Sequence, residues 1–476
     1  MEQKPIPHVL IFPLPAQGHV NSMLKLAELL CLSENLHVTY LNTQHYHHRL
    51  LRYTDAQTRF ACFPNFKFET ISDGLPDEHS RTIENLKDMF DNLETVVKPS
   101  FRELLNRKSD TRPPVTCVIG DGLFTFVVDV AKEFQIPTVS FRTASACYLW
   151  SLFCYQNLVE AGELPFQDED MDKMVACVPG MEAFLRRKDL PSFFRAKELD
   201  DPVLQVAVTA TMNSTRASAS ILNTFEELEG PILSIMKDHF PKIYAIGPLH
   251  ALLKSKRKNA VSTTSSNSLW EVDRSCLEWL DSQPVKSVVY VSFGSIVSMK
   301  IDEMFEFWHG LVDSGKRFLW VHRPNSVLHR DEKNPIPAKL LEGTKERGYI
   351  VGWSPQEEVL VHPAVGGFVT HSGWNSTLET MIAGVPMVCW PQLGDQQINS
   401  RFVSEVWNVG LDMKDTCERS MIEKLVIDLM DRKKDELSKS MDKISQLARK
   451  SISEGGSSYR NLDALIEVIK SMSLEV

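Results

Sequence analysis

The stretch from Trp353 to Gln396, WSPQEEVLVHPAVGGFVTHSGWNSTLETMIAGVPMVCWPQLGDQ, determines the fold that we expect. Its apolar run Gly367–Thr370 is typical of a buried strand. A polar loop follows, and then a helix predicted over Asn375–Ala383 and a second strand-like run at Pro386–Cys389. A strand, a helix and a strand in this order predict α/β layers built on a parallel sheet.

The same alternation of short apolar runs and helical runs fills most of the remaining chain. The further predicted strands are His8–Phe12, His37–Leu41, Val115–Ile119, Thr138–Phe141, Ser287–Phe293 and Arg317–Val321, and the further helices are Ser22–Leu30, Phe124–Phe134 and Asp302–Asp313. Between the two blocks, Lys254–Asn267 is basic and then rich in Ser, Thr and Asn, which is typical of an exposed flexible linker. The tail from Met421 is amphipathic and predicts helices.

We therefore expect an α/β protein with two Rossmann-like domains that face each other across a cleft. The predicted N-terminal domain covers residues 1–250, the linker 251–270 and the C-terminal domain 271–455. Ligands of such domains bind beyond the carboxyl ends of the parallel strands, so that each domain can hold one substrate.

Composition narrows the range of partners. The chain has 476 residues, of which 43% are apolar and 24% charged, so we expect folded domains and no long disordered region. A net charge of −10 argues against nucleic acid as the main partner, since phosphate backbones need a basic surface. Nine cysteines without a C-x-x-C pair predict free thiols in a reducing compartment.

The N-terminal sequence MEQKPIPHVLIFPLP lacks the basic start and the long apolar core of a signal peptide. No run of about 18 apolar residues occurs that would predict a transmembrane helix. We expect a cytoplasmic protein without an integral membrane segment.

The loop His371–Trp374 leads from a predicted strand end into the helix that starts near Asn375. The free N–H groups and the dipole of a helix N-terminus attract anions. His371, Asn375 and Ser376 add side-chain donors at this place, which makes it a candidate cradle for a diphosphate.

Other residues of the stretch suit the rest of a sugar nucleotide. Trp353 offers a flat face on which a base can stack, and the adjacent Asp395 and Gln396 suit vicinal sugar hydroxyls. Simpler interpretations exist: Ser376 and Glu379 also fit the S-x-x-E capping box, and Trp374 is compatible with plain packing.

The whole 44-residue stretch resembles, in register, the signature segment of plant secondary-product UDP-glycosyltransferases, including the HSGWNSTLE core and the closing Asp-Gln. The motif PLPAQGH near the start and GGSSYRNL near the end are similar to the same family. The resemblance implies a GT-B fold and an inverting mechanism. It also implies an acceptor-binding N-terminal domain, a C-terminal domain that binds a UDP-sugar, and a helix at 456–476 that crosses back to the N-terminal domain.

The resemblance also assigns roles by position. For the nucleoside, it places Trp353 on the uracil, Gln356 by the base and ribose, and Glu379 on the ribose. The residues that would hold the diphosphate are Ser295, His371, Asn375 and Ser376. Those near the sugar are Thr143, Trp374, Asp395 and Gln396. A glutamine at the last position accompanies glucose donors more often than galactose donors, so UDP-glucose is the expected co-substrate. No further cofactor and no metal are expected.

The proposed catalytic base is His19, in PAQGHVNSML, after the first strand and just before a helix. Transfer to an alcohol requires removal of the hydroxyl proton, and the ordinary histidine pKa of about 6.5 suits that task. Asp121 follows another strand end of the same domain, so it can meet His19 and orient its ring. A loop histidine and a helix N-cap are the alternatives, but the resemblance places the family's His–Asp pair here.

One departure from the family stands beside this pair. Many members have Asn-Pro where this chain has Asn21-Ser22, which we expect to affect the helix start and to leave His19 in place.

We discount the acidic run at 168–170 and the histidines at 45, 47 and 48 as metal sites. The absence of a G-x-G-x-x-G motif argues against a nicotinamide enzyme.

The acceptor should bind near His19, against apolar and aromatic loops at 75–78, 147–150 and 179–194 and beside Phe124. The overall sequence is most similar to family members that act on iridoid or other terpenoid acceptors, while phenolics and carboxylic acids remain alternative acceptor classes.

A nucleotide-sugar epimerase and a non-catalytic UDP-sugar binder are the alternative functions. We expect a monomer whose partners are the UDP-sugar and a small acceptor.

Overall fold

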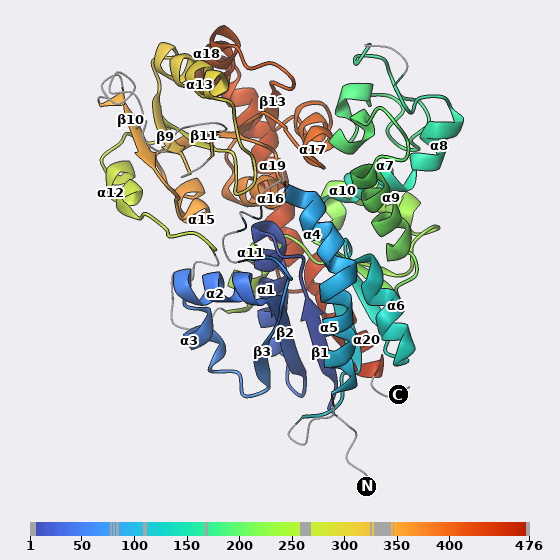
Figure 1. Cartoon of the computed structure of the whole chain (residues 1–476). Coiled ribbons are helices and arrows are strands. Elements are labelled where there is room, and N and C mark those ends of the chain that lie inside the picture. The colour runs from blue at the N-terminus through green and yellow to red at the C-terminus, as the bar shows by residue number, and fades with distance from the viewer. Residues whose placement is uncertain are drawn as a thin grey trace.

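The computed structural model describes residues 6–472 except 77–78, 80, 82–84, 108–111, 167–169, 258–267, 324–325, 328–343 and 346. Within these residues the chain forms two α/β halves that lie one above the other, the N-terminal half in blue to green and the C-terminal half in yellow to orange (Figure 1). Each half contains one sheet in which all strand pairs are parallel, as the alternating pattern predicted.

The N-terminal sheet has the strand order β3-β2-β1-β4-β5-β6-β7. Its strands are β1 (His8–Phe12), β2 (His37–Thr43), β3 (Phe66–Ile71), β4 (Cys117–Asp121), β5 (Thr138–Arg142), β6 (Ala219–Leu222) and β7 (Ile243–Ala245). Successive side chains of β1 face opposite ways: Val9 and Ile11 join one apolar cluster, and Leu10 and Phe12 join another. Both faces of the sheet are therefore covered.

The helices of the N-terminal half follow and separate these strands along the chain. They are α1 (Gln17–Cys31), α2 (Gln44–Tyr53), α3 (Ala56–Phe60), α4 (Leu86–Asn92), α5 (Lys98–Asn106), α6 (Thr125–Glu133), α7 (Ala146–Phe153), α8 (Tyr155–Glu160), α9 (Pro202–Ser214), α10 (Glu226–Met236) and α11 (Leu249–Lys256). Helix α11 includes the first residues of the segment that was predicted to be a flexible linker. Its buried Leu249, Leu252 and Leu253 pack in the same apolar cluster as α1, and residues 258–267 lie outside the described part.

The C-terminal sheet repeats the plan with the order β10-β9-β8-β11-β12-β13. Its strands are β8 (Val288–Ser292), β9 (Arg317–Val321), β10 (Gly348–Val351), β11 (Val365–Thr370), β12 (Met387–Cys389) and β13 (Gly410–Asp412). The helices of this half are α12 (Ser275–Asp281), α13 (Ile301–Asp313), α15 (Gln356–Leu360), α16 (Trp374–Ala383), α17 (Gln396–Arg401), α18 (Arg419–Ile427) and α19 (Lys434–Ile452).

The chain order reverses once in each sheet, between β1 and β4 and between β8 and β11. Crevices form at such switch points, beyond the carboxyl ends of the strands. In the N-terminal half the crevice receives the first turn of α1 and the end of β4, which carry His19 and Asp121. In the C-terminal half it receives the loops after β8 and β11, which carry Ser295 and His371.

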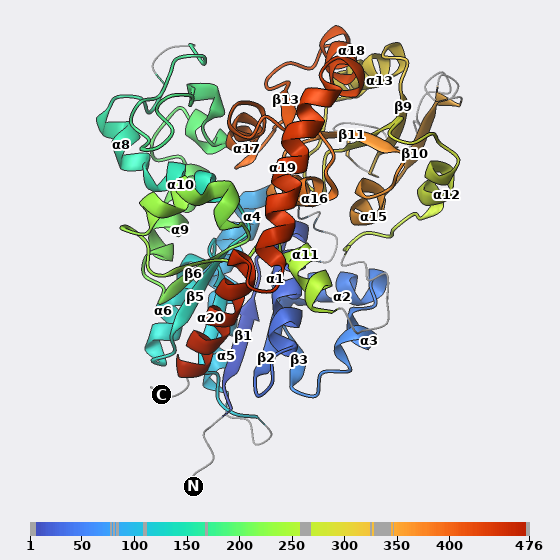
Figure 2. The same cartoon turned by 180° about the vertical axis from the view of Figure 1, so that it is seen from behind.

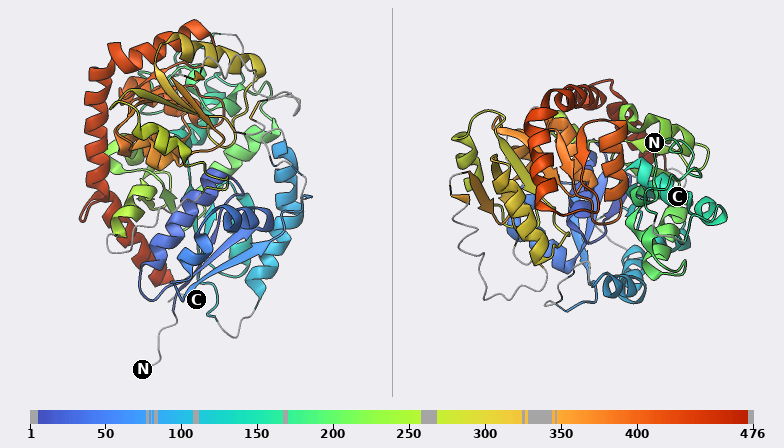
Figure 3. Two further views of the ribbon diagram at one scale, coloured as in Figure 1. Left: turned by 90° about the vertical axis from the view of Figure 1, so that its left-hand side faces the viewer. Right: turned by 90° about the horizontal axis from the view of Figure 1, so that it is seen from above.

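The last two helices connect the halves along the back of the molecule. Helix α19 runs past the C-terminal sheet toward the N-terminal half, and α20 (Ser457–Met472) continues over the N-terminal sheet (Figures 2 and 3). Leu462, Leu465 and Ile469 of α20 are buried in the cluster that contains Val9 and Ile11 of β1. The end of the chain is thus part of the core of its first half.

The two halves also share apolar packing. One cluster joins Leu149 of α7 and Ile232 of α10 to Trp374 of α16 and Ile398 of α17. All nine cysteines carry free thiols. Among the described helices, none combines the length and the apolar character that crossing a bilayer requires.

We expect Leu465→Ala to destabilise the N-terminal half, although the residue lies near the end of the chain. Leu465 is fully buried, and truncation of such a leucine costs about 2–5 kcal/mol. Hydrogen exchange should accelerate in β1 and stay unchanged in β11.

Glu467→Ala, on the exposed side of the same helix, is the matched control and should cost less than about 0.5 kcal/mol. Equal acceleration in both sheets after Leu465→Ala would contradict the assignment of α20 to the N-terminal core.

Candidate active site

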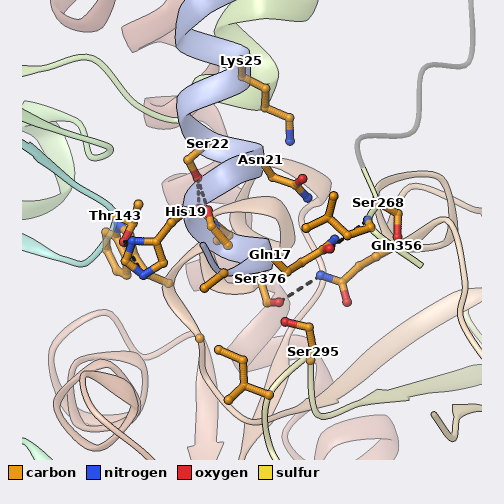
Figure 4. Close-up of a pocket in the computed structure, with 18 of the residues that line it drawn as sticks. Gln17, His19, Asn21, Ser22, Lys25, Thr143, Ser268, Ser295, Gln356 and Ser376 are labelled. Atoms are coloured by element: carbon orange, nitrogen blue, oxygen red, sulfur yellow. Dashed lines mark hydrogen bonds between the residues drawn. The ribbon is translucent and has the colours of Figure 1, made fainter. Parts of the chain in front are cut away.

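A cleft of about 1830 Å³ lies between the carboxyl edges of the two sheets. Residues from both halves line it, and they include all thirteen site residues predicted from the sequence. Figure 4 shows His19 and Thr143 together at one side, and Gln356, Ser376 and Ser295 at the other.

His19 lies in the first turn of α1, because this helix begins at Gln17, earlier than the sequence pattern predicted. Its Nδ1 atom is 2.6 Å from Oδ2 of Asp121, the last residue of β4. Thr143 Oγ1 is 3.2 Å from the same ring nitrogen. The His19 side chain is 19% exposed, so its ring borders the open cleft while Asp121 lies behind it.

The Asp121 carboxylate is buried and fully engaged. It accepts hydrogen bonds from the backbone N–H groups of Leu14 and Leu123, in addition to the bond with His19. Burial alone would raise the pKa of Asp121, but the His19 ring and these N–H groups outweigh it and hold the pKa below its ordinary value. Asp121 is not an N-cap, because Phe124 occupies that position of α6.

The N-terminus of α16, where the sequence predicted a cradle for a diphosphate, borders the cleft. Gly373 is the N-cap of this ten-residue helix and offers no side-chain acceptor, so the first N–H groups of the helix stay available to an anion. The His371 ring packs against Gly294 and Gly373, and a Cβ at either glycine would overlap it. Glycine at these two positions therefore lets the loops after β8 and β11 approach each other closely.

Burial, together with the neighbouring Arg323, lowers the pKa of His371 to about 4. The ring is thus neutral at pH 7 and can donate a hydrogen bond without adding charge. Arg323 lines the same cleft and holds the Val297 carbonyl through Nη2 at 2.6 Å. Its guanidinium is the cation that a diphosphate would meet on this side.

Ser376 and Glu379 do not form the capping box that their spacing allowed, because α16 starts two residues before Ser376. Both side chains instead accept hydrogen bonds from Nε2 of Gln356, at 2.9 and 2.7 Å. Burial and the nearby Glu357 raise the pKa of Glu379 to about 7. Lys25 of α1 opposes this effect and lies 2.7 Å from Glu357.

The predicted stacking residue Trp353 already has an aromatic neighbour. The Trp270 ring lies 5.9 Å from it in a stacked orientation, and the Arg49 guanidinium lies 4.5 Å from the Trp270 ring centroid. Arg49 also donates two hydrogen bonds to the Leu269 carbonyl. The segment before α12 thus forms one wall of the base end of the cleft.

Two polar residues follow β12 at the centre of the cleft. Gln396 Oε1 accepts from the backbone N–H groups of Gln392 and Leu393, which fixes the orientation of the amide. Asp395 accepts a hydrogen bond from Asn399 at 2.8 Å, and burial raises the pKa of Asp395 to about 6.

Trp374 and Asn375 are directed toward the N-terminal half. Trp374 is 3% exposed and donates from Nε1 to the Asn223 carbonyl at 2.8 Å. The Asn375 amide donates to the Gly18 carbonyl and accepts from Ser22 and from the Asn223 side chain. Both residues line the cleft, and both also hold the two halves together.

The acceptor side differs from the sequence expectation. Phe124 is a core residue that packs against Phe12, and residues 77–78 lie outside the described part. Of the predicted loops, Tyr148 and Phe193 line the cleft. The other apolar residues of this wall are Leu123, Val203, Val206 and Ala207, the last three on α9.

Comparisons with known proteins show to which family the chain belongs. The sequence profile described as "UDP-glucoronosyl and UDP-glucosyl transferase" matches residues 13–440. The 7-deoxyloganetic acid glucosyltransferase of Catharanthus roseus is 55% identical over 472 residues, which are 98% of either chain. The chain belongs to the UDP-glycosyltransferase family.

Two further relatives show how widely this family varies. A myricetin 3-O-rhamnoside 1,2-glucosyltransferase of Crocosmia x crocosmiiflora is 44% identical over 98% of this chain and 96% of its own. A Medicago truncatula glycosyltransferase, solved in complex with UDP-glucose, superposes with a TM-score of 0.79 at 29% identity and 98% coverage of both chains. This UDP-glycosyltransferase therefore has the GT-B fold that the resemblance implied.

The sequence analysis missed several residues of the UDP-glycosyltransferase cleft. Arg323 follows the end of β9, at the same sheet edge as Ser295. This position after a strand end could have identified it as a cleft residue from the sequence. Ser22 and Lys25 lie on α1 about one and two turns beyond His19, but their partners Asn375 and Glu357 are more than 300 positions away. Among the described residues, no cluster of three His, Cys, Asp or Glu side chains could hold a metal ion.

We expect Lys25→Met to weaken UDP binding in a pH-dependent manner. Without the ammonium group the pKa of Glu379 rises further above 7, so less of this carboxyl is ionised at neutral pH. A shift of one pKa unit corresponds to a loss of up to about tenfold in UDP affinity at pH 7, if the ribose needs the ionised form. The loss should shrink at pH 9, as calorimetric titration with UDP would show.

Lys256→Met is the matched control, because Lys256 pairs with Asp463 on the surface away from the cleft. A loss of affinity that is the same at pH 7 and pH 9 would contradict the charge argument.

Proposed function

We propose that this enzyme transfers glucose from UDP-glucose to a hydroxyl group of a small apolar metabolite, with inversion, to give a β-glucoside. The observation that carries the proposal is the His19–Asp121 contact of 2.6 Å. The same cleft is lined by His371 and Ser295, in the loops after β11 and β8, and by Ser376 in the first turn of α16. A base on one wall and an anion site on the other are what a direct displacement requires.

On the acceptor wall, the ionised Asp121 accepts a hydrogen bond from Nδ1–H of His19, which leaves Nε2 as the nitrogen that can take a proton. The acceptor hydroxyl gives its proton to this nitrogen while its oxygen attacks the anomeric carbon. The ionised Asp121 stabilises the imidazolium that forms. Thr143, within hydrogen-bond distance of the ring, lies near the transferred sugar in this arrangement.

On the donor wall, the leaving UDP takes the electrons of the broken glycosidic bond. The N–H groups at the start of α16, the neutral His371 and the hydroxyls of Ser376 and Ser295 stabilise its charge. Attack from the face opposite UDP turns the α-linked donor into a β-linked product. We assign the base to Trp353 and Gln356, the ribose to Glu379, and the glucose hydroxyls to Asp395 and Gln396.

The acceptor class follows from similarity and from the acceptor wall. Leu123, Phe193, Val203 and Val206 give this wall an apolar surface, and the relative that is 55% identical is named for 7-deoxyloganetic acid. We therefore propose an iridoid or related terpenoid acceptor, glucosylated at a hydroxyl or carboxyl group. An epimerase that interconverts UDP-sugars has no use for a base directed at an acceptor.

We further propose that the enzyme acts in the cytoplasm as a monomer, without a metal or further cofactor. All the residues to which we give a role come from this one chain.

We expect His19→Ala to lower kcat by about 10²–10⁴-fold, the usual contribution of a general base. Asp121→Asn should also lower kcat, because it weakens the support of the imidazolium. The UDP affinity should stay unchanged in both variants. The measurement is acceptor-dependent UDP release from UDP-glucose.

Full activity of His19→Ala with a hydroxyl acceptor would rule out the mechanism. A carboxyl acceptor is already ionised at pH 7, so its loss in the same variant should be much smaller. The size of the loss therefore tells which group of the acceptor receives the sugar.

We expect acid to weaken the binding of the glucose moiety specifically. As the pH falls through about 6, Asp395 gains a proton and can no longer accept two hydrogen bonds from sugar hydroxyls. The ratio of UDP-glucose affinity to UDP affinity should therefore fall between pH 7 and pH 5. Calorimetric titrations of both ligands provide the measurement. Asp395→Asn, titrated in the same way, is the control, because the terminal phosphate of UDP itself gains a proton at about pH 6.

Asp395→Asn should lose this pH dependence. A ratio that stays constant from pH 7 to pH 5 in the wild type would contradict the contact between Asp395 and the sugar.

A further inference from the structure

A buried arginine lies beside the catalytic pair, on the acceptor side of the cleft. Arg142 is the last residue of β5 and precedes Thr143, whose hydroxyl contacts the His19 ring. Arg142 lines the cleft, yet its side chain is only 3% exposed. The mechanism described above gives it no task.

Arg142 has few protein partners. Its Nη1 donates to the Gly122 carbonyl at 3.0 Å, and no ion pair joins it to a carboxylate in the part of the chain that the structure describes. A guanidinium carries five N–H groups, so one neutral carbonyl satisfies only part of its capacity. A buried cation without a bonded anion is costly, and it is retained at such a position where a ligand supplies the anion.

The surroundings of the Arg142 guanidinium are suited to binding an anionic ligand. A Cβ at residue 122 would overlap the Arg142 side chain, so the glycine gives the arginine its path to the cleft. The neighbouring wall is apolar, with Leu123, Phe193 and Val206. An acceptor with an apolar body and one anionic group matches both parts of this wall.

Two other cations of the cleft, Lys25 and Arg81, are paired with carboxylates. Lys25 lies 2.7 Å from Glu357, and Arg81 lies 2.9 Å from Asp73. Arg142 has no such partner among the described residues, and it precedes Thr143, which contacts the proposed base.

Acids near this place make a cation necessary for an anionic acceptor. Asp121 and Asp395 both act electrostatically on Arg142. Asp121 is committed to His19, and Asp395 to Asn399. A carboxylate that entered the acceptor space would be repelled by these two acids unless a positive charge faced it.

We infer that Arg142 binds the carboxylate of the acceptor. The acceptor is then a hydroxy acid, whose hydroxyl reaches His19 while its carboxylate pairs with the guanidinium in the bidentate manner that arginine favours. This inference rests on the proposed function, and it narrows the acceptor from an apolar metabolite to an acid that is glucosylated at its hydroxyl.

The test compares an acid with its methyl ester, which keeps the hydroxyl and the apolar body and lacks the charge. With 7-deoxyloganetic acid and its methyl ester as probes, the wild type should show a kcat/KM about 10- to 100-fold higher for the acid. Arg142→Met should raise KM for the acid by the same factor and leave the ester nearly unchanged. Arg142→Lys, which keeps the charge without the planar fork, should restore part of the preference.

Arg323→Met is the matched control, since Arg323 is a similarly buried arginine at the other end of the cleft. It should weaken UDP-glucose binding and leave the ratio of acid to ester unchanged. Unchanged UDP affinity of Arg142→Met shows that this variant is folded.

The inference is overturned if the wild type turns over the ester as well as the acid. It is also overturned if Arg142→Met lowers kcat equally for both, because the arginine then acts through Asp121 and not on the acceptor. Failure of the proposed function looks different, since the wild type would then transfer glucose to neither probe. In that case the affinity of the acid for the UDP-bound enzyme is measured by calorimetry. Equal affinities of the wild type and Arg142→Met overturn the inference, and a lower affinity of Arg142→Met supports it.

Discussion

The N-terminal ends of α1 and α16 meet in the cleft, where the Asn375 side chain joins them through hydrogen bonds with Gly18 and Ser22, and a third bond ties Asn375 to Asn223 after β6. Gly18 precedes His19, and Asn375 precedes Ser376. The contact therefore sets the spacing between the proposed base and the anion site. A displacement of about 1 Å between reacting groups can cost about 100-fold in rate, so the packing of the two halves against each other is part of the chemistry.

The charges inside the cleft are arranged so that an anionic donor can enter. The pKa of His371 is lowered to about 4 and that of Asp395 is raised to about 6, so the first residue carries no charge at pH 7 and the second gains a proton more readily than an ordinary aspartate. Burial causes both shifts. Asp121 differs because three donors hold it ionised behind His19. The same environment thus keeps one carboxylate charged behind the proposed base and moderates the charge of the two residues that we assign to the sugar nucleotide.

The sequence was sufficient for most of the fold and for the site residues at strand ends. The bounds of β1 and β9 match the predicted runs, because short apolar segments between polar loops leave little choice. His19 and Asp121 could be paired without coordinates, since parallel strands bring their carboxyl ends to one edge.

Side-chain partners that are distant in sequence could not be predicted in this way. The S-x-x-E pattern at Ser376 left a cap open as an alternative, but the helix starts earlier and both side chains accept hydrogen bonds from Gln356. Phe124 was assigned to the acceptor pocket from its composition, whereas its position after β4 turns it into the core. Each of these outcomes depends on tertiary neighbours that no local pattern encodes.

The position of α20 has a consequence for synthesis. Its buried leucines complete the cluster around β1, a strand that leaves the ribosome long before α20 does. Domains usually fold as they emerge, N-terminal first. Here an apolar face of the first half stays uncovered until α20 has been made, so the time between the synthesis of β1 and that of α20 is a period in which this face needs protection from other chains. The order of translation and the order of core completion are opposed in this protein.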